Sequence, residues 1–176
     1  MKTLETDRLV LRDWELAEAA DMLEFYRDPA IWPKAGGSVL TDIAQCRQCI
    51  RDYAVAQETW AVVLKETQKP IGSIFLEDIG RYPEYREMEF VLSSIYHNHG
   101  YMTEAVRRVL QFAFEEQKLS VVAVCHYPDN VQSRRVIEKC GFTYEGTLRR
   151  YSKNGKDSVR YSMTRDEWAS LHNKSI

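Results

Sequence analysis

The residues whose types and spacing best suit ligand binding lie in the segment 96–105 (YHNHGYMTEA). A strand is expected just before this segment, and an amphipathic helix just after it. The first backbone N–H groups of a helix have no partner inside it and carry about half a positive charge, so an anion such as phosphate can bind there. Gly100 has no Cβ and lets a ligand approach the chain closely. The pattern predicts a phosphate-binding helix start, although a strand–loop–helix without a ligand has the same pattern.

A second motif lies downstream over residues 130–142 (NVQSRRVIEKCGF). Asn130 is a favourable residue to begin a helix, and Gly141 is the residue type that commonly ends one with a positive φ angle. Two other phosphate-binding patterns are missing from the sequence. It has neither the Gly-Lys-Ser/Thr of nucleotide hydrolases nor the three-glycine fingerprint of dinucleotide-binding proteins.

Taken together, the two motifs resemble the GNAT superfamily of acetyl-CoA-dependent N-acetyltransferases, and within it the RimJ/RimL type, which acetylates the N-termini of ribosomal proteins. The opening segment 4–12 (LETDRLVLR) resembles the first strand of that branch, and residues 145–168 resemble its closing hairpin. The resemblance covers nearly the whole chain. It implies a single domain over residues 1–176, acetyl-CoA as the acetyl donor, and a primary amine as the acceptor, either a protein N-terminal α-amine or a small-molecule amine.

The resemblance assigns the phosphate loop to residues 97–103. In the family this loop reads Gln/Arg-x-x-Gly-x-Gly/Ala, which places His97, Gly100 and Met102 at the motif positions, and only Gly100 keeps the usual residue type. A basic residue often precedes the glycine in RimJ/RimL-like chains. Here that residue is His99, whose imidazole would make a phosphate contact sensitive to pH. The implied cofactor-binding loop comprises His97, Asn98, His99, Gly100, Tyr101, Met102 and Thr103.

The family holds the pantetheine arm of coenzyme A (CoA) between the strand before the loop and the strand after the helix. By resemblance, backbone groups near Val91 and Leu92 pair with this arm, and a backbone N–H there polarises the thioester oxygen. Asn130 matches the asparagine that binds pantetheine or caps the following helix, and both roles remain open.

Acetyl transfer needs a base, because an amine attacks only in its neutral form. The resemblance implies Glu87, which matches the glutamate that precedes the loop in RimJ/RimL-like sequences. Glu89 points the same way from the strand and is the alternative base, at a position where relatives commonly have glycine. Two carboxylates on one face can raise the pKa of one of them, which suits a base near neutral pH. A surface pairing with Arg81 or Arg86 is the other interpretation of either glutamate.

The departing thiolate benefits from a proton donor. Many family members use a tyrosine in the helix after the asparagine, but that position here is Ile137, which cannot donate. Ser133, four residues earlier on the same helix face, matches a serine proposed for this role in RimL-type enzymes. It is therefore the candidate acid and a cofactor contact, with an ordinary helix-surface serine as the alternative.

The acceptor is expected opposite CoA, near the first helix pair, where Trp32, Tyr26 and Tyr151 could form an aromatic wall. Basic side chains on the two helices beside CoA could meet its 3′-phosphate or merely face solvent: Arg107, Arg108, Arg134, Arg135 and Lys139. Two other functions compete with acetyl transfer. One is a non-catalytic acyl-CoA sensor or interaction module, and the other is a nucleic-acid-binding domain.

Composition argues against several protein classes. The chain has 176 residues, 24 Lys and Arg against 26 Asp and Glu, and a net charge of −2. This balance provides no basic stripe for nucleic acid. No apolar run reaches the roughly 18 residues of a membrane span, and acidic residues occupy the place of a signal core, so we expect a cytoplasmic protein without a membrane partner.

Cysteine and histidine spacing does not predict a metal site. Cys46 and Cys49 form a C-x-x-C string, but Cys125 and Cys140 are too far apart in sequence to supply a second close pair. The cysteines are therefore expected to be small apolar residues in the core. A homodimer through an exposed apolar face of the final hairpin is also compatible with the sequence.

Hydrophobic periodicity predicts the elements that position these residues. Strands are expected over Thr6–Trp14, Thr59–Lys65, Ile71–Glu77, Glu87–Leu92, Ser120–His126, Phe142–Tyr151 and Ser158–Thr164. Helices are expected over Glu15–Tyr26, Thr41–Ala56, Tyr101–Gln117 and Asn130–Lys139, with a loop over Trp32–Ser38. Hairpins combined with one strand–helix–strand unit indicate an α+β fold. The central sheet is expected to be mixed, mostly antiparallel and flanked by helices, as in the acyl-CoA N-acyltransferase (GNAT) fold.

Overall fold

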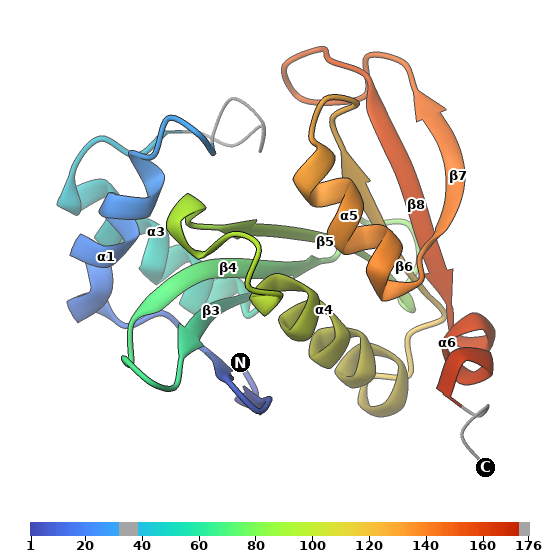
Figure 1. Ribbon diagram of the computed structural model, residues 1–176, viewed down its shortest axis with the longest axis horizontal. Coiled ribbons are helices and arrows are strands. Elements are labelled where there is room, and N and C mark those ends of the chain that lie inside the picture. Colours follow the sequence, from blue (N-terminus) through green and yellow to red (C-terminus); the bar gives the residue numbers. More distant parts are fainter. Residues whose placement is uncertain (32–38, 173–176) are drawn as a thin grey trace.

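One mixed sheet organises the computed structural model, which describes residues 1–31 and 39–172. Its eight strands follow the order β1-β2-β3-β4-β5-β6-β8-β7 (Figure 1). The strands are β1 (Leu4–Glu5), β2 (Leu9–Arg12), β3 (Thr59–Leu64), β4 (Pro70–Glu77), β5 (Tyr85–Leu92), β6 (Val121–His126), β7 (Thr143–Leu148) and β8 (Ser158–Thr164). All neighbours pair antiparallel except β5 and β6, which are parallel. The expected mixed, mostly antiparallel sheet is confirmed.

Helices cover both faces of this sheet (Figure 1). They are α1 (Ala19–Tyr26), α3 (Ile43–Ala56), α4 (Tyr101–Gln111), α5 (Val131–Cys140) and α6 (Arg165–His172). One apolar core joins α1 and α3 to the face that carries Ala61, Val63 and Val91. A larger core joins α4, α5 and α6 to the opposite face. Side chains that alternate along β5 therefore point into two different environments.

Helix α4 forms where the apolar spacing places it. Met102, Ala105, Val106, Val109 and Leu110 are buried along one face of the helix. The residue before the helix, Gly100, has φ +80°, a conformation that side chains with a Cβ rarely adopt. Instead of continuing to Gln117, the helix widens into a π-turn over Phe112–Glu116 before the chain enters β6. The strand–helix–strand unit β5-α4-β6 is present as expected.

The first expected strand, Thr6–Trp14, is wrong in its extent. The Thr6 N–H donates to the Leu9 carbonyl at 3.0 Å, so the chain turns there and forms the hairpin of β1 and β2. The following helix begins as a 3₁₀ turn over Leu16–Glu18, before α1 starts. The expected loop over Trp32–Ser38 lies outside the described residues.

The end of the chain also differs from expectation. The strand expected over Phe142–Tyr151 is shorter in the structure, because β7 ends at Leu148. Since β8 begins at Ser158, a loop over residues 149–157 joins the two strands. Trp168 belongs to α6, which the periodicity did not predict. The Trp168 ring lies 5.8 Å from the Phe114 ring, and this contact attaches α6 to the end of the α4 segment. Across the described parts of the chain, no helix is both long and apolar enough to cross a bilayer.

Candidate active site

β5 and β6 pair along only part of their lengths. Their register runs from Tyr85 opposite Val121 to Met88 opposite Val124, yet β5 continues to Leu92 and β6 to His126. Beyond Met88 the two strands separate, and α4 and α5 flank the opening (Figure 1). The backbone groups of residues 89–92 that face β6 therefore have no strand partner there. Buried backbone N–H and C=O groups need partners, and an extended ligand with amide groups could supply them.

A cavity of about 990 Å³ occupies this opening and passes from the α4–α5 side to the α1–α3 side. The predicted residues that line it are Glu87, Glu89, Val91, Leu92, His97, Asn98, Gly100, Tyr101, Met102, Thr103, Asn130 and Ser133. The structure thus brings together all of the predicted catalytic and cofactor-binding residues except His99, while the predicted basic and aromatic contacts are placed below. The volume of the cavity falls in the range of pockets that hold small ligands.

The loop before α4 shapes one end of the cavity. Gly100 is the residue at the N-terminal cap of α4, so the unpaired first-turn N–H groups begin at the cavity wall. The His97 ring lines the cavity at the end of β5, with its Nε2 3.1 Å from the Leu92 carbonyl oxygen. Asn98 has φ +66°, which completes the sharp turn of this loop.

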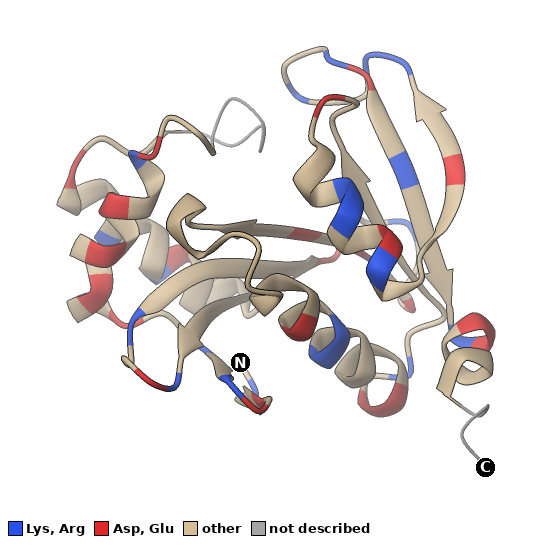
Figure 2. Ribbon diagram, viewed as in Figure 1, with Lys and Arg blue, Asp and Glu red and all other residues tan. Residues whose placement is uncertain are grey.

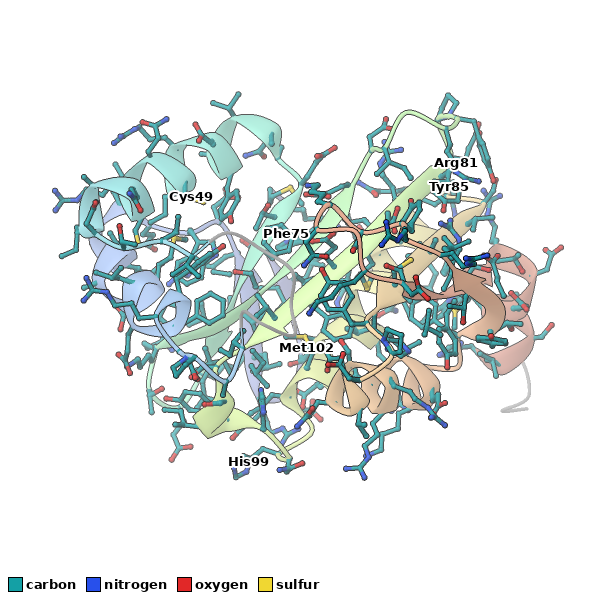
Figure 3. All side chains as sticks on the ribbon, turned by 90° about the horizontal axis from the view of Figure 1, so that it is seen from above. Cys49, Phe75, Arg81, Tyr85, His99 and Met102 are labelled. Atoms are coloured by element: carbon teal, nitrogen blue, oxygen red, sulfur yellow. The ribbon has the colours of Figure 1, made fainter. Side chains whose placement is uncertain are left out.

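His99 lies outside the cavity lining. Its ring stacks on Tyr101 with 5.6 Å between centroids, and Figure 3 shows it at the outer edge of the molecule. Its carbonyl accepts a hydrogen bond from the Arg8 guanidinium at 3.0 Å. Arg8 also forms an ion pair with Glu104 at 2.6 Å and lies 4.5 Å from the centroid of the Tyr101 ring. Sequence reasoning missed Arg8, which fixes the start of α4 from the β1–β2 turn.

Helix α5 forms the opposite wall. The Asn130 Oδ1 accepts from the Ser133 N–H at 3.1 Å, so Asn130 caps the helix while it also lines the cavity. Ile137, at the position of the family tyrosine, is fully buried in the core. Figure 2 shows basic residues along α5, and of the five predicted phosphate contacts Arg135 and Lys139 line the cavity.

The other three predicted basic residues have protein partners. Arg107 donates to the Lys139 carbonyl at 2.7 Å, Arg108 lies 3.6 Å from Glu116, and Arg134 pairs with Glu138 at 2.8 Å. None of the three lines the cavity between α4 and α5. Arg135 and Lys139 are therefore better placed than these arginines to meet a phosphate in it.

Three carboxylates meet at the α1–α3 end of the cavity. Glu87 and Glu89 share one face of β5, and Glu77 on β4 lies directly opposite Glu87. Burial raises the pKa of Glu77 and of Glu89, while the positive charge of Lys153 lowers both. Sequence reasoning missed Glu77 and Lys153, because neither lies in a motif.

Arg81 and Arg86 do not form ion pairs with these carboxylates. The Arg81 guanidinium lies 5.3 Å from the centroid of the Tyr85 ring, and Figure 3 shows the two labelled residues next to each other. Arg86 lies 3.4 Å from Asp78. The alternative in which a surface arginine neutralises Glu87 or Glu89 therefore does not hold for these two residues.

The cysteines fall into two pairs by location. Cys46 and Cys140 are buried as expected, whereas Cys49 and Cys125 are half-buried and line the cavity. Burial and, to a smaller extent, the nearby charge of Glu87 raise the pKa of Cys125 to about 12. Cys125 is consequently a neutral thiol at physiological pH and a poor nucleophile.

Aromatic side chains complete the α1–α3 end. The hydroxyl groups of Tyr26 and Tyr53 lie 2.9 Å apart, and burial raises the pKa of both phenols, so this wall is uncharged. Phe75 packs edge-on against Tyr53 at 5.5 Å, and Cys49 belongs to the same apolar cluster. Tyr151 lines the cavity from the β7–β8 loop, while the predicted Trp32 lies outside the described residues.

Metal chemistry receives no support from the arrangement of side chains. Within residues 1–31 and 39–172, no three His, Cys, Asp or Glu side chains gather as a metal site requires.

Comparisons with known proteins agree with this geometry. A family model described as "Acetyltransferase (GNAT) domain" matches residues 8–143. The uncharacterized N-acetyltransferase p20 of Bacillus licheniformis is 28% identical over 177 residues, which span 96% of this chain and 99% of p20.

Two solved structures have the same fold. A ribosomal-protein-S5-alanine acetyltransferase from Vibrio fischeri superposes with a TM-score of 0.77 at 20% identity, covering 96% of this chain and 99% of its own. The microcin C7 self-immunity acetyltransferase MccE, solved with acetyl-CoA and AMP, superposes with a TM-score of 0.78 at 18% identity, covering 90% and 93%.

Proposed function

Because the chain belongs to the GNAT acetyltransferase family, we propose that it moves an acetyl group from acetyl-CoA directly to a primary amine, either a protein N-terminal α-amine or a small-molecule amine. That it is an acyltransferase using acetyl-CoA follows from the family. The observation that carries the proposal is the separation of β5 from β6 beyond Met88, beside the N-terminus of α4 and next to a group of carboxylates.

The residues present fit the donor. The edge of β5 beyond Met88, which has no strand partner on the β6 side, suits the amide groups of pantetheine, and the N-terminal N–H groups of α4 suit the diphosphate. Arg135 and Lys139 on α5 supply positive charge along the same cavity. When bound, acetyl-CoA supplies a thioester carbonyl that is open to attack.

Glu87 is the proposed base. It lines the cavity on the face of β5 that looks toward α1 and α3, away from the face that packs on α4. An amine that enters from the α1–α3 side therefore meets a carboxylate before it reaches the thioester. Glu87 accepts the proton that the amine must lose, and Glu89, two residues on, is the alternative acceptor.

Two further groups act on the developing charges. A backbone N–H near Val91 or Leu92 donates to the oxyanion that forms on the carbonyl oxygen. The Ser133 hydroxyl, which lines the cavity from α5, donates to the departing sulfur. Its backbone N–H is already committed to Asn130, and this bond holds the first turn of α5 in place.

An acceptor screen that follows release of free CoA thiol tests the proposal. Peptides with different free N-terminal residues should be compared with the same peptides carrying a blocked N-terminus, and small amines with their N-acetylated forms. The proposal predicts thiol release that depends on enzyme and on a free amine, together with an acetylated product seen by mass spectrometry. Thiol release that is equal for free and blocked acceptors across the whole panel would contradict it.

A further inference from the structure

The side-chain amine of Lys153 lies at the α1–α3 end of the cavity, where the acceptor is proposed to enter. Lys153 belongs to the β7–β8 loop, over residues 149–157, and lines the cavity together with Glu77, Glu87 and Glu89. It forms no hydrogen bond or ion pair with any described residue, so its ammonium group is not committed to another contact. Its positive charge nevertheless acts on the carboxyl groups of Glu77 and Glu89, which places it at the same end as the proposed base.

The loop that carries Lys153 is held against the cavity wall. The Asn154 Oδ1 accepts from the Tyr127 hydroxyl at 3.2 Å and from the Ser152 hydroxyl at 2.6 Å. The Gly155 N–H donates to the Ser152 carbonyl at 2.8 Å, which closes a tight turn around Lys153. Tyr127 itself lines the cavity, so both sequence neighbours of Lys153 are anchored beside it.

We propose that Lys153 is a self-acetylation site, modified in cis by the active site of its own chain. The inference rests on the proposed function, because it uses the same donor and the same base. A lysine side chain is a primary amine, the class of acceptor on which this family acts. Its long flexible stem can also carry the amine from the cavity mouth toward the thioester.

The step balances without any further reactant. The neutral Lys153 amine attacks the thioester carbonyl carbon, the new C–N bond forms, and the C–S bond breaks. Glu87 accepts the proton that the nitrogen loses, and the CoA thiolate takes up a proton to leave as the free thiol. The product is an uncharged amide, so the modification removes the cation that balances Glu77 and Glu89.

Covalent labelling measures the modification directly. Purified protein is incubated with deuterium-labelled acetyl-CoA, and its peptides are analysed by mass spectrometry. Because the reacting groups are held together, the label should accumulate at Lys153 roughly tenfold or more faster than at Lys156. Lys156 is a matched control in the same turn, where its ammonium lies 4.9 Å from the centroid of the Tyr127 ring. The first-order rate should not change with protein concentration, because the reaction is intramolecular.

Variants separate catalysis from spontaneous acetylation. Lys153→Arg should leave only the slow labelling of Lys156 in this loop, Lys156→Arg should leave the labelling of Lys153 unchanged, and Glu87→Gln should slow the labelling of Lys153. Equal labelling of Lys153 and Lys156, or labelling of Lys153 at an unchanged rate in Glu87→Gln and Gly100→Val, would overturn the inference. An enzyme that acetylates external amines while Lys153 stays unlabelled would also overturn it, but would leave the proposed function standing. If no amine at all is acetylated, both the proposed function and the self-acetylation of Lys153 are overturned.

Discussion

Glu77 on β4 and Glu87 on β5 lie directly opposite each other in the antiparallel ladder. Like charges in this position destabilise a sheet, so their pairing is a cost that packing elsewhere must offset. Burial raises the pKa of Glu77, and the charge of Glu87 adds to this effect. The arrangement places a carboxylate that is reluctant to ionise beside the proposed base, at the end of the cavity where an amine must give up a proton.

Replacing Glu87 tests its role in proton transfer. Glu87→Gln keeps the size of the side chain but removes its ability to accept a proton, so kcat at neutral pH should fall roughly 10²–10⁴-fold. CoA affinity, measured by calorimetry, should stay nearly unchanged, because the binding surface lies on β5 beyond Glu87 and on α4. Glu77→Gln is the matched control, with the same change on the facing strand, and should retain far more turnover. Equal loss of turnover and CoA affinity in Glu87→Gln would show that Glu87 supports the structure of the site and does not transfer a proton.

Gly100→Val tests the phosphate loop. A Cβ at this position would lie 3.5 Å from the Arg8 guanidinium, and the φ angle of +80° adds backbone strain of about 1–2 kcal/mol, so the loop before α4 must shift. CoA affinity should fall by roughly tenfold or more, a loss of at least about 1.4 kcal/mol in binding free energy. Gly80→Val is the matched control, because Gly80 has φ +72° and the variant carries similar backbone strain. An added Cβ there would have nothing within 4 Å, and Gly80 lies in the loop between β4 and β5. Normal CoA binding by Gly100→Val, or equal loss in both variants, would discredit the loop assignment.

Gly72→Ala tests the strand edge that pantetheine is proposed to meet. A Cβ on Gly72 would lie 2.3 Å from the Val91 carbonyl oxygen and 3.0 Å from the Leu92 Cα. Because both contacts are backbone atoms, β5 must shift at Val91 and Leu92. The free energy of unfolding should fall by roughly 1–3 kcal/mol in urea denaturation. CoA affinity should fall as well, and a variant that loses neither stability nor affinity would show that this edge is not constrained.

The pH dependence of stability reports on Glu89. Burial raises the pKa of this carboxyl group in the folded state above its unfolded value. The folded state then binds more protons than the unfolded state, so stability falls as pH rises through the window between the two pKa values. Glu89→Gln removes this fall in stability at higher pH, because glutamine has no proton to lose. Thermal denaturation should give the variant a higher Tm than the wild type near pH 7, and the difference should vanish near pH 4, below the ordinary pKa of about 4.3. A difference of the opposite sign at neutral pH would contradict the assignment.

Local sequence patterns predicted much of this structure. The apolar spacing of α4 and the glycine before it predict the loop at the start of α4, and alternation in β5 puts Glu87 and Glu89 on one face. The motif at Asn130 correctly begins α5. These features depend on residues close together in sequence, where period and capping chemistry act.

The remaining site residues depend on contacts between distant segments. Glu77 meets Glu87 only through the register of β4 and β5, and Lys153 reaches the cavity only because the loop over residues 149–157 is held against Tyr127. Arg8 reaches Glu104 because the β1–β2 turn brings it to α4. Likewise α6 has a single buried residue, Trp168, and such a short helix has too weak a periodicity to be predicted.

The most direct test of the central claim is a crystal structure of the protein grown with acetyl-CoA. We expect the diphosphate against the N-terminal N–H groups of α4 at Gly100, and the pantetheine arm along the free edge of β5 between Glu89 and Leu92. The acetyl group should then lie beside Glu87. Acetyl-CoA bound elsewhere on the surface, or a cavity that stays empty at saturating ligand, would contradict the account.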